Sequence, residues 1–284
     1  MKIIKGKKIA ENILNDLKEK IKLLKKKPCL AVVLVGDDKA SQIYIKLKEL
    51  ASKKIGIEFK KFLFDKKERE KEIIKKIKEL NKNKRVTGII VQLPLPKKLN
   101  KNLIINAVSP KKDVDGFHIK NQNLFLENKK SVEPVFPKAI VKMINVARDG
   151  DNLKAIIVCR SEIFGRIMKK TLEKNEIQAE FIFCKDLIDN NKNNKYAHII
   201  LKRADIVISA CGTPGLIKGE AVKNNAIIID GGITKKNKIV LGDVDINSFK
   251  NTDCKITPVP GGVGPVTVAT LLENVYLTSK KTDF

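Results

Sequence analysis

The amino-acid sequence predicts an α/β protein of two domains, each built on a parallel β-sheet covered by helices. The chain of 284 residues, with 43% hydrophobic residues, is long enough to bury two modest cores. Short apolar runs alternate with helix-periodic segments in two separate blocks, as expected for parallel sheets with helical crossovers. A loop-rich stretch at about 109–137 separates the blocks.

The first block begins with a helix over 9–24, where apolar residues recur at helical spacing until Pro28, before an apolar run at 30–35 that predicts a buried strand. A turn at 36–41 leads into a helix over about 41–55, which Gly56 closes. The remaining elements are a strand near 57–64, a helix near 67–80 and a strand over 86–92. This βαβαβ order implies a parallel sheet.

The second block has the strand–turn–helix order of a Rossmann-type dinucleotide-binding domain. A strand over 154–159 precedes a helix that opens near Gly165, and further strands are predicted over 180–184, 205–209 and 226–230. We interpret the Asn- and Lys-rich stretch 189–195 as a solvated loop.

A dense Pro/Gly loop at 256–265 precedes an apolar helix predicted over about 266–277. Proline fixes φ and glycine frees it, so a loop rich in both indicates backbone that approaches a ligand closely. A simple interdomain linker is the alternative interpretation.

Cysteine and histidine usage argues against metal chemistry. No two cysteines form a CxxC pair and several lie in apolar runs, so we expect buried reduced thiols rather than disulfides or a zinc site. Two histidines, His118 and His198, are too few for a His-rich metal site. The five cysteines are Cys29, Cys159, Cys184, Cys211 and Cys254.

A formal charge of +26 raises the question of nucleic-acid or membrane binding. The lysines are spread through nearly every predicted helix, and aromatic residues make up only 5% of the chain, so we expect no specific nucleic acid. A basic RNA-binding or scaffold protein remains the alternative of another class, and salt-sensitive RNA binding without enzymatic turnover would favour it. No apolar run is long enough to span a bilayer, and the charged N-terminus has no signal-like apolar core, so we expect a soluble cytoplasmic protein without membrane contact.

Tyr44 and Lys48 lie four residues apart on a predicted helix and therefore share a face. Short-chain dehydrogenases also use a Tyr-x-x-x-Lys pair, but there a glycine-rich cofactor motif comes first, and none precedes Tyr44. Four longer motifs, the first of which contains both Tyr44 and Lys48, allow a more specific interpretation of the pair. They are Val-Gly-Asp-Asp-Lys-Ala-Ser-Gln-Ile-Tyr-Ile-Lys-Leu-Lys at 35–48, Gly-Ile-Ile-Val-Gln-Leu-Pro-Leu-Pro at 88–96, Pro-Lys-Lys-Asp-Val-Asp-Gly-Phe-His at 110–118 and Thr-Pro-Val-Pro-Gly-Gly-Val-Gly-Pro-Val-Thr-Val-Ala-Thr at 257–270.

These four motifs, and their order along the chain, closely resemble those of the family of bifunctional methylenetetrahydrofolate dehydrogenase/methenyltetrahydrofolate cyclohydrolase enzymes. The resemblance implies NADP-dependent oxidation of 5,10-methylenetetrahydrofolate and hydrolysis of the methenyl product to 10-formyltetrahydrofolate. It also implies a homodimer, and a parallel αβα catalytic domain at 1–136 that the C-terminal segment 260–284 completes. A Rossmann domain at 137–259 would bind the nicotinamide cofactor, with folate in the cleft.

Carried over residue by residue, the resemblance implies that Lys48 is the catalytic lysine and Gln92 its partner. Asp115 would bind the pterin edge by charge-assisted hydrogen bonds, and Tyr44 would stack on the aminobenzoyl ring. A partly buried lysine near the positive methenyl group can exchange protons near neutral pH. Further implied substrate-binding residues are Leu93, Pro94, Pro260, Gly261 and Gly262.

The implied cofactor residues are Arg160, Ser161, Gly165, Arg166, Asp186, Cys211, Gly212, Ile233, Gly264 and Thr267. Here the sequence departs from the family pattern, because Cys159 replaces the first glycine of the cofactor turn and Ile167 replaces a proline. We expect Cys159 to crowd the turn or the ligand, and Asp186 to repel a 2′-phosphate. NADP is therefore the expected cofactor with NAD open, and a cyclohydrolase without dehydrogenase activity is the alternative enzyme.

Overall fold

The computed structural model describes residues 1–188, 192–236 and 239–282 and divides the chain into two compact units. The first unit comprises Met1–Ile9 and Phe136–Thr267, and the second comprises Ala10–Val135 and Val268–Phe284. Within the described ranges, no helix combines the length and apolarity needed to cross a bilayer.

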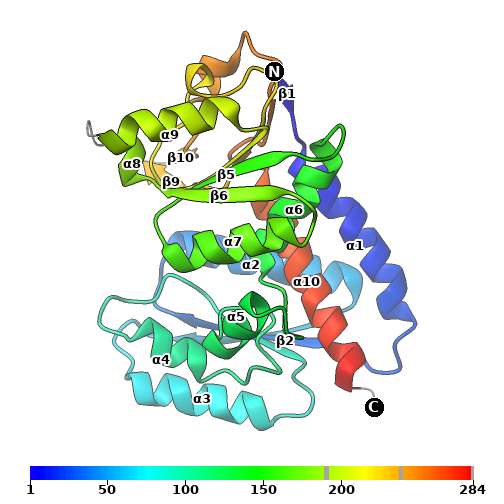
Figure 1. Cartoon of the computed structure of the whole chain (residues 1–284). Coiled ribbons are helices and arrows are strands. Elements are labelled where there is room, and N and C mark those ends of the chain that lie inside the picture. Colours follow the sequence, from blue (N-terminus) through cyan, green and yellow to red (C-terminus); the bar gives the residue numbers. More distant parts are fainter. Residues whose placement is uncertain (189–191, 237–238, 283–284) are drawn as a thin grey trace. The chain divides into compact units, whose positions relative to one another are not determined.

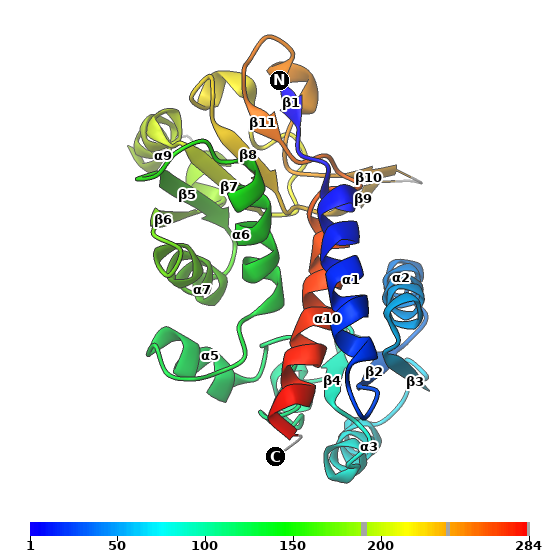
Figure 2. The same ribbon diagram turned by 90° about the vertical axis from the view of Figure 1, so that its right-hand side faces the viewer.

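The second unit is built on a three-stranded parallel sheet in the order β3-β2-β4. Its central strand β2 is buried along its whole length because helices cover both faces, and Figure 2 shows α2 and α3 on opposite sides of the sheet. The C-terminal part of α10 lies beside α1 in both ribbon views (Figures 1 and 2). The elements are α1 (Gly6–Lys22), β2 (Cys29–Val35), α2 (Lys39–Ile55), β3 (Glu58–Phe64), α3 (Glu70–Lys82), β4 (Gly88–Val91), α4 (Lys101–Asn106), α5 (Ile119–Leu126) and α10 (Val263–Thr282).

The βαβαβ prediction for this unit is confirmed, including the left-handed end of α2 at Gly56, where φ is 86°. Asp38 begins that helix by accepting a hydrogen bond from Ser41 N at 2.7 Å. The short helices α4 and α5 were not predicted. Helix α5 has only eight residues, of which the four apolar ones lie mainly at its C-terminal end, so its sequence is too short to show a helical period.

The first unit contains a six-stranded parallel sheet in the order β1-β11-β8-β7-β5-β6. Figure 1 shows α8 and α9 on one side of this sheet and α6 and α7 on the other, which confirms the predicted Rossmann-type layering. The elements are β1 (Lys2–Ile3), α6 (Val135–Ala147), β5 (Lys154–Cys159), α7 (Glu162–Glu173), β6 (Gln178–Phe183), α8 (Lys185–Ile188), α9 (Lys192–Arg203), β7 (Ile206–Ala210), β8 (Ile227–Asp230), β9 (Thr234–Lys236), β10 (Ile239–Leu241) and β11 (Lys255–Ile256).

Two further helices, α6 and α9, were not predicted, and the start of α10 differs from the prediction. Helix α6 begins inside the predicted loop region, and it accommodates Pro137 because this residue lies in the first turn, where no backbone N–H is needed for the helix. Helix α9 begins at Lys192, so the predicted loop at 189–195 is wrong from 192 onward, and 189–191 lie outside the described residues. Helix α10 begins at Val263, three residues before the predicted start.

The expectation that all five cysteines are reduced is wrong for Cys184 and Cys211, which form a disulfide with a Cα–Cα distance of 6.1 Å. No sequence spacing signals this pair. Strands β6 and β7 flank β5 on opposite sides, and the residues that follow their carboxyl ends converge over the end of β5. For Cys29, Cys159 and Cys254 the prediction of buried free thiols is confirmed.

Candidate functional site

The second unit brings Lys48 of α2 against Gln92, the residue that follows β4. Lys48 Nζ donates a hydrogen bond to Gln92 Oε1 at 2.9 Å. Two further bonds fix the glutamine, because its backbone N–H donates to Val33 O at 2.8 Å and its Nε2 donates to Leu93 O at 2.8 Å. With the amide nitrogen occupied in this way, only the amide oxygen faces the lysine.

Asp115 completes a cluster with Lys48. Burial raises the pKa of the Asp115 carboxyl to about 6, with Asp113 adding to the shift and Lys48 opposing it. Burial also lowers the pKa of the Lys48 ammonium, although Asp115 opposes that change. Burial therefore shifts the pKa values of both groups toward neutral pH, upward for Asp115 and downward for Lys48. Such shifted pKa values suit the two groups for proton transfer and ligand binding.

Asp113, which the sequence interpretation did not single out, is the buried carboxylate that shapes the Asp115 loop. Its Oδ1 accepts from the backbone N–H groups of Gly116 at 3.0 Å and Phe117 at 3.3 Å, and its Oδ2 accepts from His118 N at 2.9 Å. Asn121 Nδ2 of α5 donates to the same Oδ2 at 2.9 Å. Both aspartates of the Asp-Val-Asp-Gly motif resemble turn residues in sequence, so only the structure separates their roles.

Asn274 of α10 holds the same loop from the other side. Its Nδ2 donates to Val114 O at 3.0 Å and to Glu133 O at 2.9 Å, and the residue is buried. The C-terminal helix therefore anchors the backbone that presents Asp115. Nothing in the sequence marked Asn274, since it is a single amide in a helix that also contains other polar residues.

Three further predicted residues are sequence neighbours of this cluster: Tyr44 is on the same helix as Lys48, and Leu93 and Pro94 directly follow Gln92. Tyr44 lies one helical turn before Lys48, and burial raises the pKa of its hydroxyl. Leu93 and Pro94 lie shortly after β4 and are joined to each other by a cis peptide bond. Ser41 Oγ donates a hydrogen bond to Leu93 O at 3.5 Å. Leu93 is half-buried, whereas Pro94 is exposed.

In the first unit, Arg160 follows β5 at the carboxyl edge of the sheet. Its guanidinium donates through Nε to Cys211 O and through Nη2 to Thr213 Oγ1, the latter at 3.0 Å. Arg160 also lines a pocket of about 380 Å³, together with Phe183, Cys184, Lys185 and Ile188. Two cations at the edge of a dinucleotide-binding sheet can hold a phosphate group.

The prediction that Gly165 opens the helix after β5 is wrong, whereas the cofactor contact of Ser161 stays a prediction. Helix α7 begins at Glu162, and Ser161 Oγ caps it by accepting from Phe164 N at 3.4 Å. Gly165 therefore lies inside the helix rather than at its start. A Cβ at Gly165 would lie 2.7 Å from the Phe181 ring, so its glycine permits close packing of α7 on β6. Arg166 is exposed on the same helix and is not among the residues that line the pocket.

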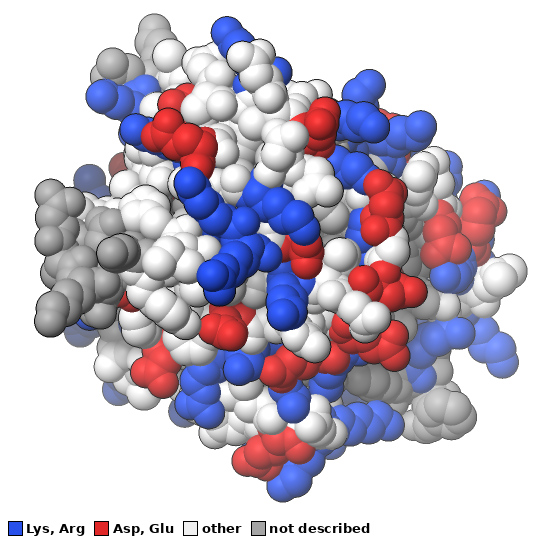
Figure 3. All heavy atoms as spheres, turned by 45° about the horizontal axis from the view of Figure 1, so that its top comes forward, with Lys and Arg blue, Asp and Glu red and all other residues white. Residues whose placement is uncertain are grey.

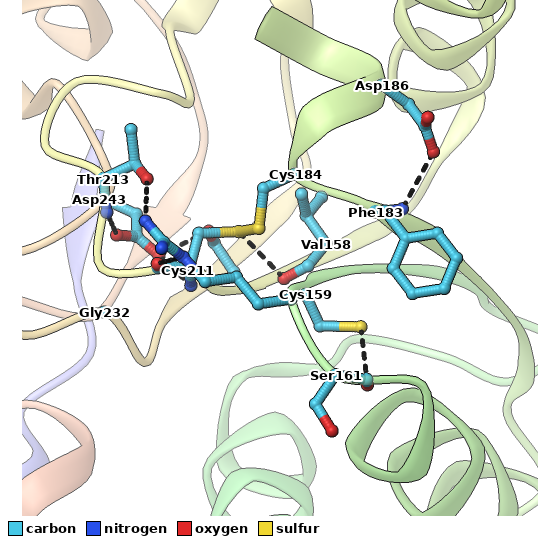
Figure 4. The surroundings of a disulfide bond; sticks show 12 residues. Val158, Cys159, Ser161, Phe183, Cys184, Asp186, Cys211, Thr213, Gly232 and Asp243 are labelled. Carbon is cyan, nitrogen blue, oxygen red and sulfur yellow. Dashed lines mark hydrogen bonds between the residues drawn. A yellow bond between two sulfur atoms is a disulfide. The ribbon is translucent and has the colours of Figure 1, made fainter. Parts of the chain in front are cut away.

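Asp186 does not face the pocket as predicted. Its Oδ2 accepts a hydrogen bond from Phe183 N at 3.1 Å, so the carboxylate closes the turn between β6 and α8 (Figure 4). Lys185 instead lines the pocket, with its Nζ 5.6 Å from the centre of the Phe183 ring. Lys185 therefore adds a positive charge to the pocket wall, and the repulsion of a 2′-phosphate by Asp186 stays a prediction.

The expected crowding at Cys159 is absent from the turn. The side chain is fully buried at the end of β5, and its thiol donates to Ser161 O at 3.5 Å. Burial raises the pKa of this thiol to about 11. Ile167, which replaces the family proline, is likewise buried in α7.

Cys211 and Gly212 lie in the loop after β7, which a second missed carboxylate, Asp243, organises. Asp243 is fully buried and accepts from Ser209 Oγ at 2.7 Å, Cys211 N at 2.7 Å and Thr213 N at 2.6 Å. Its own N–H donates to Asp230 Oδ1 at 2.9 Å, and this links the loops after β7 and β8. Ile233, in the loop after β8, is 53% exposed and available for contact.

The Pro/Gly loop belongs to the first unit up to Thr267. Gly261 has a φ of 102°, and a Cβ at Gly262 would lie 2.5 Å from Pro258 O, so both positions require glycine. Pro260 is exposed. Gly264 and Thr267 lie in the first turns of α10, where Thr267 Oγ1 donates to Val263 O at 3.0 Å.

Charged side chains of both signs are mixed on the surface of the chain. On the face shown in Figure 3, Asp and Glu lie among the Lys and Arg side chains around one central basic group. Among the described residues, no three His, Cys, Asp or Glu side chains gather in a way that could hold a metal ion.

Comparison with known proteins connects both units to one family. A model of the catalytic domain of tetrahydrofolate dehydrogenase/cyclohydrolase matches residues 4–115, and a model of its NAD(P)-binding domain matches 134–283. The bifunctional protein FolD of Ruthia magnifica subsp. Calyptogena magnifica is 41% identical over 281 residues, covering 98% of each chain.

Solved structures of two enzymes of this family have the same fold as this chain. The bifunctional FolD of Campylobacter jejuni is 34% identical, with a TM-score of 0.90 over 99% of both chains. The FolD of Trypanosoma brucei, solved with NADP cofactor and inhibitor, is 26% identical, with a TM-score of 0.89 over 99% of this chain and 98% of that one. These matches cover both blocks that the sequence motifs span, and they confirm the resemblance. The chain belongs to the tetrahydrofolate dehydrogenase/cyclohydrolase family.

Proposed function

We propose that this chain oxidises 5,10-methylenetetrahydrofolate with NADP and hydrolyses the methenyl product to 10-formyltetrahydrofolate. The Lys48–Gln92 hydrogen bond of 2.9 Å, next to the raised pKa of Asp115, is the observation that carries the proposal. Family membership and this cluster favour a folate enzyme over an RNA-binding or scaffold protein.

In the hydrolysis, Lys48 is the proton-transfer group. Its lowered pKa makes the neutral amine accessible, and the positive charge of the methenyl group lowers it further. The amine accepts a proton as water attacks the methenyl carbon, then returns it to folate N5 as the C–N5 bond breaks. The hydroxyl on that carbon loses its proton and becomes the formyl oxygen. Gln92 holds the amine in position.

Asp115 is the proposed anchor of the pterin. Above its pKa of about 6 the carboxylate can accept two hydrogen bonds from the amino-pyrimidine edge. Asp113 and Asn274 fix the loop that carries it, so the anchor is rigid before the substrate arrives. Tyr44 supplies an aromatic surface for the aminobenzoyl ring.

The first unit is the proposed NADP domain, and its residues fit that cofactor. Arg160 and Lys185 in one pocket match a 2′-phosphate, and the Asp243 network fixes the loop after β7. When bound, the nicotinamide accepts a hydride from the methylene carbon. The proposed domain limits are 1–136 with 260–284 for folate and 137–259 for the cofactor, and the division into units supports them apart from Met1–Ile9, Phe136 and residues 260–267, which belong to the first unit.

One assay tests the proposal. Purified protein is mixed with 5,10-methylenetetrahydrofolate and NADP, and absorbance reports cofactor reduction and then loss of the methenyl product. The proposal requires both phases. Decay of added methenyltetrahydrofolate without any cofactor reduction would instead support a cyclohydrolase that has lost its dehydrogenase activity.

Replacing Arg160 with glutamine is expected to weaken NADP binding about tenfold and to leave NAD binding nearly unchanged. The change removes one of the two cations that line the pocket, and only NADP carries the extra phosphate. Calorimetry with each cofactor measures the effect. Arg203→Gln, an equal change of charge at the exposed end of α9, is the control, and an equal loss for NAD would exclude a role for Arg160 at the 2′-phosphate.

We further propose that the chain works as a homodimer in the cytoplasm. Helix α2 exposes an apolar stripe formed by Ile43 (59%), Leu47 (49%) and Leu50 (56%). The neighbouring strand β3 is an edge of its sheet and exposes Leu63 (67%), and an ion pair between Glu49 and Lys61 at 2.9 Å joins the two elements. Apolar residues on an open edge are typical of an interface.

The double variant Leu50→Glu/Leu63→Glu is expected to sediment as a monomer at micromolar concentration, whereas the wild type sediments as a dimer. Burying two new carboxylates in an apolar interface costs more than a typical interface contact contributes. Leu23→Glu serves as the control because Leu23 is 86% exposed outside this surface. A wild type that sediments as a monomer would contradict the proposal.

A further inference from the structure

The Cys184–Cys211 disulfide lies in the wall of the Arg160 pocket. Cys184 follows β6 and lines the pocket directly, and Cys211 follows β7. Figure 4 shows the bond crossing above Val158 and Cys159 at the end of β5. Disulfides in cytoplasmic enzymes are uncommon, and those known are usually transient or redox-sensing.

Each cysteine of the disulfide is connected to one of the two basic residues of the pocket, Lys185 or Arg160. Cys184 is covalently followed by Lys185, which lines the pocket. On the other side, the Cys211 carbonyl accepts from Arg160 Nε, and Thr213 Oγ1, two residues further on, accepts from Arg160 Nη2 at 3.0 Å. One covalent bond therefore ties together the two loops that position Lys185 and Arg160.

We propose that Cys184 and Cys211 form a reversible oxidation site whose disulfide fixes Arg160 and Lys185 for the cofactor 2′-phosphate and so strengthens NADP binding. The proposal rests on the proposed NADP-dependent function. Reduction leaves two thiols that must separate to van der Waals distance, and both loops lose the tether. Without it, NADP binding must order two mobile cations and is weaker.

The oxidant is a low-molecular-weight disulfide such as oxidised glutathione. The thiolate of one cysteine attacks it, forms a mixed disulfide and releases one small thiol. The second cysteine thiolate attacks the protein sulfur of that mixed disulfide and releases the other small thiol. In sum, the two protein thiols lose two electrons and two protons, and the small disulfide becomes two thiols.

The other cysteines are poor competitors for this reaction. All five cysteines are buried, but Cys29, Cys159 and Cys254 do not line the pocket, whereas Cys184 does. Burial also raises the pKa of the Cys29 and Cys159 thiols to about 11, so both stay protonated at neutral pH. Selective oxidation is thus expected to begin at Cys184 in the pocket wall and to end in the disulfide with Cys211.

The first measurement counts thiols in the full-length protein. After equilibration with oxidised glutathione, the protein is denatured, alkylated and analysed by peptide mass spectrometry. Cys184 and Cys211 should be protected as a linked pair, and the other three cysteines should be alkylated. After treatment with dithiothreitol all five should be alkylated. Alkylation of Cys184 and Cys211 in the oxidised sample would overturn the proposal, whatever the activity of the protein.

The second measurement compares cofactor binding in the two states by calorimetry. Reduction is expected to raise the Kd for NADP about fivefold to tenfold, within the usual range of coupling between two sites, and to change the Kd for NAD less. Cys184→Ser should bind NADP like the reduced wild type in both conditions. Cys254→Ser, which leaves the pair intact, should keep the redox dependence.

Two outcomes separate this proposal from the proposed function. Equal NADP affinity in the oxidised and reduced wild type overturns the oxidation site as a control of binding and leaves the dehydrogenase proposal standing. Absence of NADP binding in both states overturns the proposed cofactor and this proposal together, while hydrolysis of the methenyl substrate still tests the second unit separately.

Discussion

Lys48→Met is expected to abolish methenyltetrahydrofolate hydrolysis while the protein stays folded. Methionine keeps most of the aliphatic stem but removes the amine that transfers the proton, and general acid–base catalysis contributes about a hundredfold to ten-thousandfold in rate. The variant also leaves Gln92 Oε1 without its 2.9 Å partner. Decay of methenyltetrahydrofolate absorbance at saturating substrate measures the loss.

Lys46→Met is the matched control, because Lys46 lies on the same helix two residues away and is exposed. It should hydrolyse the substrate at the wild-type rate. Thermal unfolding of both variants should remain cooperative, which separates a catalytic defect from a folding defect. A Lys48→Met protein that retains wild-type hydrolysis would remove Lys48 from the mechanism.

The sequence predicted the longer buried strands of both sheets because such parallel strands are short apolar runs with no polar interruption. The two-residue strands β1 and β11 were not predicted. β2 and β5 illustrate this, since nearly every residue of each is buried. Prediction failed where local sequence carries no periodic signal. Helix α5 has only eight residues, half of them polar, and α6 begins with Pro137 in its first turn inside a Pro-containing stretch that resembles a loop.

Motifs predicted the residues of the folate cluster, but not the residues that support them. Lys48 and Gln92 belong to long motifs, and the structure places them in direct contact. Asn274 and Asp243 act through hydrogen bonds to backbone groups far away in sequence, as between Asn274 and Val114, and no spacing rule reveals such pairs. The disulfide depends in the same way on which loops the sheet brings together. Asp113 and Asp186 instead bond to backbone N–H groups three to five residues away, and their sequence motifs do not distinguish such turn contacts from ligand binding.

The acid limb of folate binding should follow the titration of Asp115. Its folded pKa of about 6 lies above the ordinary aspartate value, so the carboxylate is ionised above pH 6 and becomes protonated as the pH falls through that value. Folate affinity should therefore fall on acidification in the same range. Asp113→Asn removes a negative charge that raises this pKa, so in that variant the fall should occur at a lower pH.

Asp115→Ala is expected to weaken folate binding by about 2 to 4 kcal/mol at neutral pH, because a buried pair of ligand donors loses its charged acceptor. The loss should shrink below pH 6, where the wild-type carboxyl is already protonated and can no longer accept both bonds. Titration of a non-reactive folate analogue at several pH values measures both effects. Asp115→Asn keeps the side-chain volume and one acceptor, so its affinity should lie between those of the wild type and Asp115→Ala and should not depend on pH near 6. Unchanged affinity in Asp115→Ala would exclude Asp115 as the pterin anchor. The loop itself should stay intact in this variant, because Asp113 supplies the hydrogen bonds that hold it.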